Sequence, residues 1–231
     1  MSNHKKKKKD MKTNNEMVIV LHGIGLNQYF MISTESKLQK AGYEVLNLGY
    51  PFRKLDLDEL GLWLHEELQQ YKIWQNAKKV HFVGHSMGGL ITRTYLTTYK
   101  DEIPAEKMGR VVMLGTPNGG SEVADFLHEN PLYQWVFGPA GQELTTKAQN
   151  KDSTSLPWYD LGIIAGTQNW LHPFNFCINE PNDGCVSVSS TRLKGMKDHI
   201  ILPVMHGLMS WTGSVNDQAL HFLQKGSFAH Q

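Results

Sequence analysis

The pattern Gly-x-Ser-x-Gly at residues 84–88 is the part of this sequence whose residue types and spacing best suit chemistry. It follows an apolar run at 80–83 and precedes a stretch of helical character at 87–99. A serine at such a junction is typical of a nucleophile elbow, a turn so sharp that its serine stands out at the edge of a sheet. Gly84 and Gly88 fit that turn because the positions on either side of the serine are crowded together. The pattern therefore predicts Ser86 as a nucleophile.

A serine hydroxyl is a weak nucleophile, so it needs a histidine base, an acid that orients the base, and donors for an oxyanion. Among the eleven histidines, His206 follows a strand-like run at 199–205 and precedes a glycine. Open α/β folds place their chemistry at the carboxyl ends of strands, where such a histidine would lie. His221 lies in an expected C-terminal helix, and three more lie in expected excursions or in the tail: His128, His172 and His230. We therefore predict His206 as the base.

The predicted acid is Asp183. It lies in the turn sequence at 181–184, between the serine and the histidine along the chain. Serine, acid and histidine follow one another in this order in one class of parallel-sheet enzymes. Asp198 is the alternative acid, but it stands just before the strand expected at 199–204. That position would place Asp198 at the opposite end of the sheet.

Two backbone amides are predicted to stabilise the oxyanion. The amide of Met87 directly follows the nucleophile, at the positive end of the expected helix. The second amide should come from the His-Gly-Ile-Gly turn at 22–25, which follows the apolar run at 17–21. We expect it to be the amide of Ile24, whose side chain plays no part in this role.

These motifs resemble those of small bacterial lipases and esterases in the α/β-hydrolase superfamily. The resemblance runs from about residue 17 to residue 211 and rests on five places: His-Gly-Ile-Gly at 22–25, Gly-His-Ser-Met-Gly-Gly at 84–89, Gly-Thr-Pro-Asn-Gly-Gly-Ser at 115–121, the Asn-Asp-Gly-Cys-Val loop at 182–186, and His206. Asn118 stands where many members have histidine. The resemblance implies hydrolysis of carboxylic esters, of small molecules or lipids, through an acyl-enzyme and without a cofactor. The physiological substrate does not carry over, because one fold hosts many chemistries.

Other functions remain open on the same residues. The same triad could serve a thioesterase, an amidase or an acyltransferase, and a non-catalytic binding protein could share the fold. A nucleotide-binding module is a further alternative, because Gly23-x-Gly25 follows a strand and opens toward a helix. Gln28 stands in place of the third glycine of that fingerprint, which leaves the fingerprint incomplete.

The elements expected to position these residues alternate between strand and helix. Apolar periodicity predicts strands at 17–21, 43–48, 80–84, 110–114, 162–165 and 199–204, and helices at 29–41, 56–72, 87–99, from Ser121 onward, and at 215–224. In the helix expected at 56–72, the residues at helical spacing are Leu57, Leu60, Gly61, Leu64, Leu68 and Tyr71. This alternation predicts the α/β class, with a mainly parallel sheet flanked by helices on both faces, as in the α/β-hydrolase fold.

Two regions interrupt the alternation. Prolines, glycines and aromatic residues are mixed at 128–160, and a second aromatic-rich run occupies 167–182. We expect these regions to lie over the carboxyl ends of the strands and to wall a pocket for an apolar acyl chain. The insertion at about 128–160 is also a candidate lid.

Length and charge predict one domain at 16–231, preceded by a disordered basic tail at 1–15 that contains five consecutive lysines. The formal net charge of +1 argues against nucleic acid as a partner. No apolar stretch approaches the roughly 18 residues that cross a bilayer, so no transmembrane segment is predicted. The sequence holds no metal-binding or P-loop motif, and neither a metal nor a cofactor is expected.

Two cysteines, Cys177 and Cys185, flank the proposed acid. No secretory signal is visible, so the chain as given is expected in the cytoplasm with both thiols free. Removal of a signal peptide would instead allow export and a disulfide that braces Asp183.

Overall fold

A computed structural model describes residues 16–152, 156–170 and 177–230. The predicted basic tail at 1–15 and His172 lie outside these residues. The strands form one parallel sheet in the order β2-β1-β3-β4-β5-β6. Their bounds are β1 (Glu16–Leu21), β2 (Glu44–Leu48), β3 (Lys79–His85), β4 (Met108–Leu114), β5 (Asp160–Gly166) and β6 (Asp198–Leu202). Each of the six predicted strands is present.

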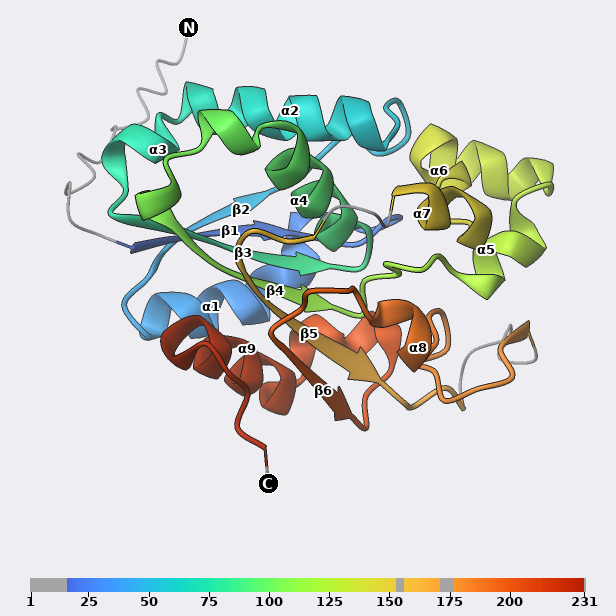
Figure 1. The fold of residues 1–231 in the computed structure, drawn as a ribbon. Coiled ribbons are helices and arrows are strands. Elements are labelled where there is room, and N and C mark those ends of the chain that lie inside the picture. Colours follow the sequence, from blue (N-terminus) through green and yellow to red (C-terminus); the bar gives the residue numbers. More distant parts are fainter. Residues whose placement is uncertain (1–15, 153–155, 171–176, 231) are drawn as a thin grey trace, which may run out of the picture.

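Helices cover both faces of the sheet (Figure 1). One face carries α2 (Leu57–Gln70), α3 (Ile73–Asn76) and α4 (Met87–Thr98), and the other carries α1 (Ile32–Lys40) and α9 (Gly213–Lys225). Short 3₁₀ turns connect elements at η1 (Gln28–Met31), η2 (Lys100–Glu102), η3 (Ala105–Lys107) and η5 (His206–Trp211). The predicted α/β class with a helix-flanked parallel sheet is confirmed. None of the described helices has the length and apolar character needed to cross a membrane.

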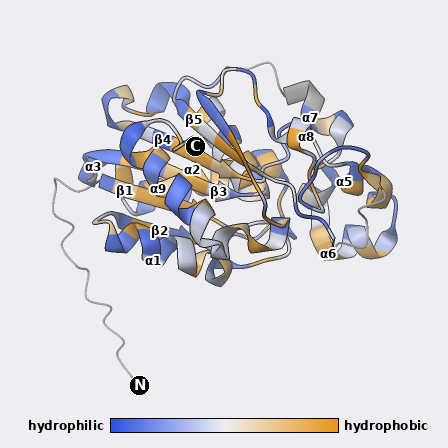
Figure 2. Ribbon diagram, turned by 90° about the horizontal axis from the view of Figure 1, so that it is seen from below, coloured by the Kyte–Doolittle hydropathy of each residue, from blue (hydrophilic) through white to orange (hydrophobic). Residues whose placement is uncertain are grey.

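The central strands are mainly apolar and buried, because both faces of the sheet are covered. In β1, Ile19 and Leu21 join the cluster packed under α2 and α4, whereas Val18 and Val20 join the cluster packed on α1 and α9. Figure 2 shows these strands as an apolar centre between helices with polar outer sides. Each such buried side chain stabilises the fold by about 1.5–3 kcal/mol.

The helix α2 illustrates how the sequence sets the ends of an element. Asp56 caps it and forms a reciprocal capping box with Glu59. Gly61 faces α4, where an added Cβ would lie 2.8 Å from Cγ2 of Thr94, so the two helices can approach closely. Tyr71, which continues the spacing of the leucines, is 47% exposed. The helix ends at Gln70, and Tyr71 is its C-cap.

The connection from β4 to β5 carries three helices beyond the carboxyl ends of the strands (Figure 1). They are α5 (Glu122–Leu127), α6 (Pro131–Gln142) and α7 (Thr146–Asp152), and we call residues 121–152 the cap segment. Ser121 caps α5 as predicted, accepting a hydrogen bond from the amide of Ala124. Within α6, Gly138 has φ 62° and ψ −162° and is followed by Pro139, so the helix is broken there.

Candidate active site

Ser86 occupies the turn between β3 and α4. Its φ of 53° and ψ of −122° lie outside the regions that non-glycine residues favour. Strain of this kind, of order 1–3 kcal/mol, persists where the surrounding structure enforces it. The amide of Ser86 donates to the carbonyl of Leu114 on β4 at 2.8 Å, and Thr116 donates its hydroxyl to the carbonyl of Ser86. The turn is therefore fixed from both sides.

The glycines of the motif are required by close contacts. A Cβ on Gly84 would lie 2.5 Å from the amide nitrogen of Gly89, and a Cβ on Gly88 would lie 2.5 Å from the carbonyl oxygen of Leu21. Both contacts are with backbone atoms, which cannot move aside without shifting the strand or the helix. The crowding inferred from the motif is present in the structure.

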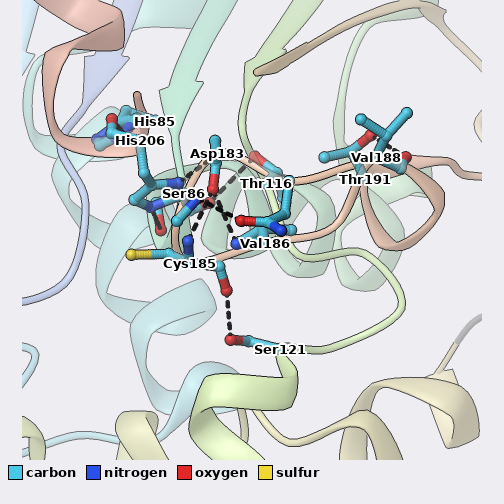
Figure 3. A network of polar contacts seen from close by, with 12 residues as sticks. His85, Ser86, Thr116, Ser121, Asp183, Cys185, Val186, Val188, Thr191 and His206 are labelled. Carbon is cyan, nitrogen blue, oxygen red and sulfur yellow. Dashed lines mark hydrogen bonds and ion pairs between the residues drawn. The ribbon is translucent and has the colours of Figure 1, made fainter. Parts of the chain in front are cut away.

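The structure brings Ser86, His206 and Asp183 together (Figure 3). Nε2 of His206 lies 2.9 Å from Oγ of Ser86, and Nδ1 of His206 lies 2.8 Å from Oδ2 of Asp183. An ionised carboxylate only accepts hydrogen bonds, so Nδ1 carries the proton in this arrangement and Nε2 is free to accept one from the serine. The hydroxyl of Ser86 can thus pass its proton to Nε2 of His206, while Asp183 holds the orientation of the imidazole.

The acid is held by its own loop. Asp183 is 1% exposed, and its Oδ1 accepts hydrogen bonds from the amides of Cys185 (3.0 Å) and Val186 (2.8 Å). Gly184 has φ 100°, a conformation that favours glycine and explains the Asp-Gly pair. With Oδ1 occupied, Oδ2 is the oxygen directed at the imidazole of His206.

The residues set aside as alternatives lie elsewhere. Asp198 begins β6, at the opposite edge of the sheet, where its carboxylate accepts from the amide of Phe228 (2.7 Å) and pairs with His230 (2.8 Å). Burial would raise the pKa of Asp198, but these hydrogen bonds outweigh it and lower the pKa. His221 lies on α9 against the carbonyl of Ser227. His128 is the C-cap of α5.

The predicted oxyanion loop runs beside the nucleophile. A Cβ on Gly23 would lie 3.2 Å from Cβ of Ser86, so the loop at 22–25 approaches the serine closely. His22 stacks on Tyr50 with ring centroids 4.2 Å apart, and the Tyr50 hydroxyl donates to the His22 carbonyl at 2.6 Å. Burial lowers the pKa of His22, which favours the neutral ring. The motif pointed to this loop, but the supporting role of Tyr50 was missed.

Met87, the other predicted donor, is the first residue of α4. The first amides of a helix have no acceptor within the helix, and the helix dipole places partial positive charge there. Ile24 lines the same pocket as Ser86, and Met87 directly follows Ser86 in the chain. The role of their amides as oxyanion donors stays a prediction.

An apolar pocket of about 360 Å³ opens beside Ser86. Its walls include the turn at 22–25, the acid loop at 182–186 and the cap segment. The lining residues are Gly23, Ile24, Leu26, His85, Ser86, Pro117, Ser121, Val123, Ala124, Leu127, Tyr133, Phe137, Leu144, Cys185, Val186, His206 and Gly207. Tyr133, Phe137 and Leu144 belong to the first region expected to wall a pocket. The described residues of the second region, 167–170 and 177–182, do not line it, and residues 171–176 lie outside the described structure.

A larger cavity of about 560 Å³ lies at the opposite edge of the sheet. Polar residues of its wall pair with one another: Nε of Arg110 lies 3.5 Å from Oδ2 of Asp160, and Nε2 of His81 lies 3.5 Å from Oε2 of Glu16. The serine, its histidine and the acid are all at the other edge. The larger of the two cavities is therefore not the one beside the candidate active site.

Further polar residues near the site were not found from the sequence. Arg93 on α4 is buried and donates to Oδ1 of Asn118 (3.0 Å) and to Oε1 of Gln149 (2.5 Å). Asn118 also donates to the carbonyl of Thr191 (2.8 Å). Asn118, which replaces the common histidine, thus joins three segments by hydrogen bonds. The available signal for Arg93 was a charged residue inside a helix that has no other charged residue.

The two cysteines form no disulfide. Burial raises the pKa of the Cys185 thiol, with a further contribution from Asp183, so this thiol stays protonated. The carbonyl of Cys185 accepts from the hydroxyl of Ser121 at 2.7 Å and so links the acid loop to α5 (Figure 3). In the part of the chain that the structure describes, no three histidine, cysteine or acidic side chains gather to hold a metal ion.

Solved structures with the same architecture are numerous and distant in sequence. The mature lipase BlEst2 of Bacillus licheniformis has a TM-score of 0.68 and 20% identity, over 89% of this chain and 88% of that chain. This chain spans only 52% of the propeptide form of the same lipase. The metagenomic carboxyl esterase MGS0156 has a TM-score of 0.66 and 16% identity, over 92% of this chain and 74% of that chain.

A thioesterase is similar to the same degree. YbtT, the type II thioesterase of the yersiniabactin biosynthetic pathway, has a TM-score of 0.63 and 13% identity, over 92% of this chain and 94% of that chain. Likeness at these identities establishes a shared fold. No curated protein matches the sequence.

The family comparison covers the N-terminal part of the chain. The family model described as the alpha/beta hydrolase fold matches residues 16–138, more than half of the 231 residues. That range includes the His-Gly-Ile-Gly turn at 22–25 and the Gly-x-Ser-x-Gly turn at 84–88. Together with the parallel sheet, this match shows that the chain belongs to the α/β-hydrolase fold family.

Proposed function

We propose that this protein is a serine hydrolase that cleaves carboxylic esters through an acyl-enzyme intermediate. The observation that carries the proposal is the continuous chain of short contacts from Oγ of Ser86 through His206 to Asp183, beside an apolar pocket. Such a chain is what a serine needs to become a nucleophile. The hydrolase-fold family membership is consistent with it.

In the acylation step, Oγ of Ser86 attacks the acyl carbonyl while Nε2 of His206 takes its proton. Asp183 holds the imidazole tautomer and stabilises the imidazolium that forms. The amides of Ile24 and Met87 stabilise the tetrahedral oxyanion, a contribution of about 2.7–4 kcal/mol per donor in related sites. His206 then protonates the departing alcohol and the C–O ester bond breaks.

In the deacylation step, His206 takes a proton from water as the water attacks the acyl-Ser86 carbonyl. The second tetrahedral intermediate collapses, Ser86 recovers its proton, and the carboxylic acid leaves. Besides the substrate, the two steps use one water molecule and the side chains and amides named above.

The pocket favours an apolar acyl group, because mainly apolar side chains surround the space next to Ser86. Small-molecule esters and lipids both offer such a group. We further propose that residues 128–160, within a single domain at 16–231, act as a lid. The broken helix at Gly138 and Pro139 provides a place where α6 can bend.

The test is hydrolysis of p-nitrophenyl esters of increasing acyl length, combined with labelling by a fluorophosphonate probe. Ser86→Ala should abolish both turnover and labelling while circular dichroism stays unchanged. Ser121→Ala is the matched control for labelling, because its hydroxyl also lines the pocket but is engaged on the Cys185 carbonyl. Folded wild-type protein that neither labels nor hydrolyses any ester would refute the proposal.

The same assay separates the related acyl-transfer activities. We compare kcat/KM for three substrates that carry the same acyl chain: an oxygen ester, a thioester and an amide. A thioester preference of more than about tenfold over the oxygen ester would reassign the protein to thioester hydrolysis on the same triad.

A further inference from the structure

His85, the residue directly before the proposed nucleophile, is a buried imidazole that the mechanism above does not use. It is 2% exposed although it borders the pocket, and its ring centroid lies 4.9 Å from that of His206 (Figure 3). A buried polar ring in such a place is expected to form at least one hydrogen bond within the protein.

One nitrogen of His85 is engaged on the backbone of the base. Nε2 of His85 lies 3.0 Å from the carbonyl oxygen of His206. A carbonyl oxygen can only accept, so Nε2 must carry the hydrogen and Nδ1 must be the bare nitrogen. Nδ1 has no hydrogen-bond partner among the described residues and faces Gly23, where an added Cβ would lie 2.9 Å away. The neutral Nε2–H tautomer is thus fixed by geometry.

The contact from His85 completes a set of restraints on His206. The amide of His206 donates to the carbonyl of Asp183 at 3.0 Å, and its Nδ1 is bonded to the side chain of the same aspartate. Its carbonyl oxygen is the remaining backbone group, and His85 bonds it. A Cβ placed on the next residue, Gly207, would meet no atom of the described residues within 4 Å, so none of their side chains packs on the start of η5 from that direction.

We propose that His85 is a positioning residue for ester hydrolysis, whose Nε2–H holds the His206 backbone at a fixed distance from Ser86. Because His85 and Ser86 are adjacent in one rigid turn, the restraint ties the base to the same element as the nucleophile. The inference rests on the proposed function and deepens it. Misplacement of a catalytic group by about 1 Å can lower the rate by about 100-fold.

The charge of His85 agrees with this role. Burial, followed by the nearby charge of His206, lowers the pKa of His85 to about 3. The ring therefore stays neutral in neutral solution and keeps the tautomer that donates to the carbonyl. A neutral ring also avoids repelling the imidazolium that forms on His206 during the reaction.

The experiment compares His85→Gln, whose side-chain amide can still donate to the carbonyl, with His85→Leu, which cannot. For His85→Leu we expect kcat to fall by about 10- to 100-fold, with KM changed by less than about threefold. His85→Gln should recover most of that loss. Equal kcat for the wild type and a folded His85→Leu, or equal loss in both variants, would overturn the proposal.

His81→Leu is the matched control. His81 is also buried and lies on the same strand, but its Nδ1 accepts from the amide of Arg110 near the other end of β3. It should lower Tm while leaving kcat within about twofold of the wild type, because it touches no proposed site residue. A fall in kcat as large as that of His85→Leu would show a general effect of losing a buried histidine, and would overturn the positioning role.

A measurement on the unaltered protein covers the case in which the variants do not fold. Nitrogen NMR of the histidine rings should show His85 as the Nε2–H tautomer, without titration above about pH 5. An Nδ1–H tautomer would overturn the inference. This measurement needs no turnover, so it stands even where the esterase assay or the fluorophosphonate labelling fails.

Discussion

Arg93 on α4 donates to Oε1 of Gln149 on α7 across 2.5 Å, and both side chains are buried. The helix that begins at the nucleophile is thereby bonded to the segment that covers the pocket. The amide nitrogen of Gln149 also donates to the carbonyl of Glu143, at 2.8 Å. Loss of this contact should therefore loosen the cap segment and lower the free energy of unfolding of the whole domain.

Gln149→Ala should lower the free energy of unfolding by about 1–3 kcal/mol, because a buried guanidinium loses one of its acceptors. Urea unfolding followed by circular dichroism measures the change. Gln142→Ala is the matched control in the same segment, since Nε2 of Gln142 is buried and has no hydrogen-bond partner in the part of the chain that the structure describes. It should change the free energy of unfolding by less than about 0.5 kcal/mol. Equal effects in the two variants would mean that the contact with Arg93 does not anchor the cap segment.

Phe137→Ala should change the preference for acyl length. Phe137 lines the pocket and packs on Tyr133 with ring centroids 4.7 Å apart, so its removal enlarges the space beside Ser86. The ratio of kcat/KM for p-nitrophenyl decanoate to that for the butyrate should rise by about tenfold. Trp135→Ala, on the same helix but 73% exposed, should leave the ratio unchanged. If the ratio of kcat/KM for the decanoate to that for the butyrate were similar in both variants, Phe137 would not determine the preference for acyl length.

Asp183→Asn should lower kcat by about 10⁴-fold, because the amide no longer holds the tautomer in which Nε2 of His206 is the base. Asp198→Asn should leave kcat within about twofold and lower Tm instead, since Asp198 joins β6 to the C-terminal residues Phe228 and His230. Both are measured with one activated ester, and thermal unfolding is followed in parallel. The opposite ranking of kcat would assign the acid to Asp198.

Much of the fold could be predicted from the chain because it depends on local signals. The apolar runs gave the six strands, and the small residues around Ser86 identified a turn that only glycine can flank. Order along the chain was enough to place Asp183 and His206, because parallel strands bring their carboxyl ends to one edge. The contact between His206 and Ser86 joins residues 120 positions apart, both of which follow strands of the same parallel sheet.

Features that depend on tertiary contacts could not be predicted in the same way. Tyr71 continues the leucine periodicity of α2, yet the helix ends one residue before it. The partners of Arg93 come from the loop after β4 and from α7, whose packing no local pattern encodes. His85 reads as the variable position of a motif, and only its distance to the His206 carbonyl shows what it contacts.

The free energy of unfolding should decrease as the pH is lowered below about 6.5. Burial is the largest cause that lowers the pKa of His81, to about 4, and that of His85, to about 3. In the unfolded chain both rings take up protons near pH 6.5, whereas the folded protein resists protonation. Each contributes stability that is complete above pH 6.5 and is lost as the pH falls toward its folded pKa, by roughly 1 kcal/mol per pH unit.

Urea unfolding at several pH values between 7.5 and 4.5 measures this slope. His81→Gln should flatten it, because a glutamine takes up no proton in either state. Asp198 does not contribute in this window, since its lowered pKa makes its stabilisation disappear only at more acidic pH. A slope that His81→Gln leaves unchanged would show that His81 is readily protonated in the folded protein, and that its burial between β1 and β4 does not exclude water.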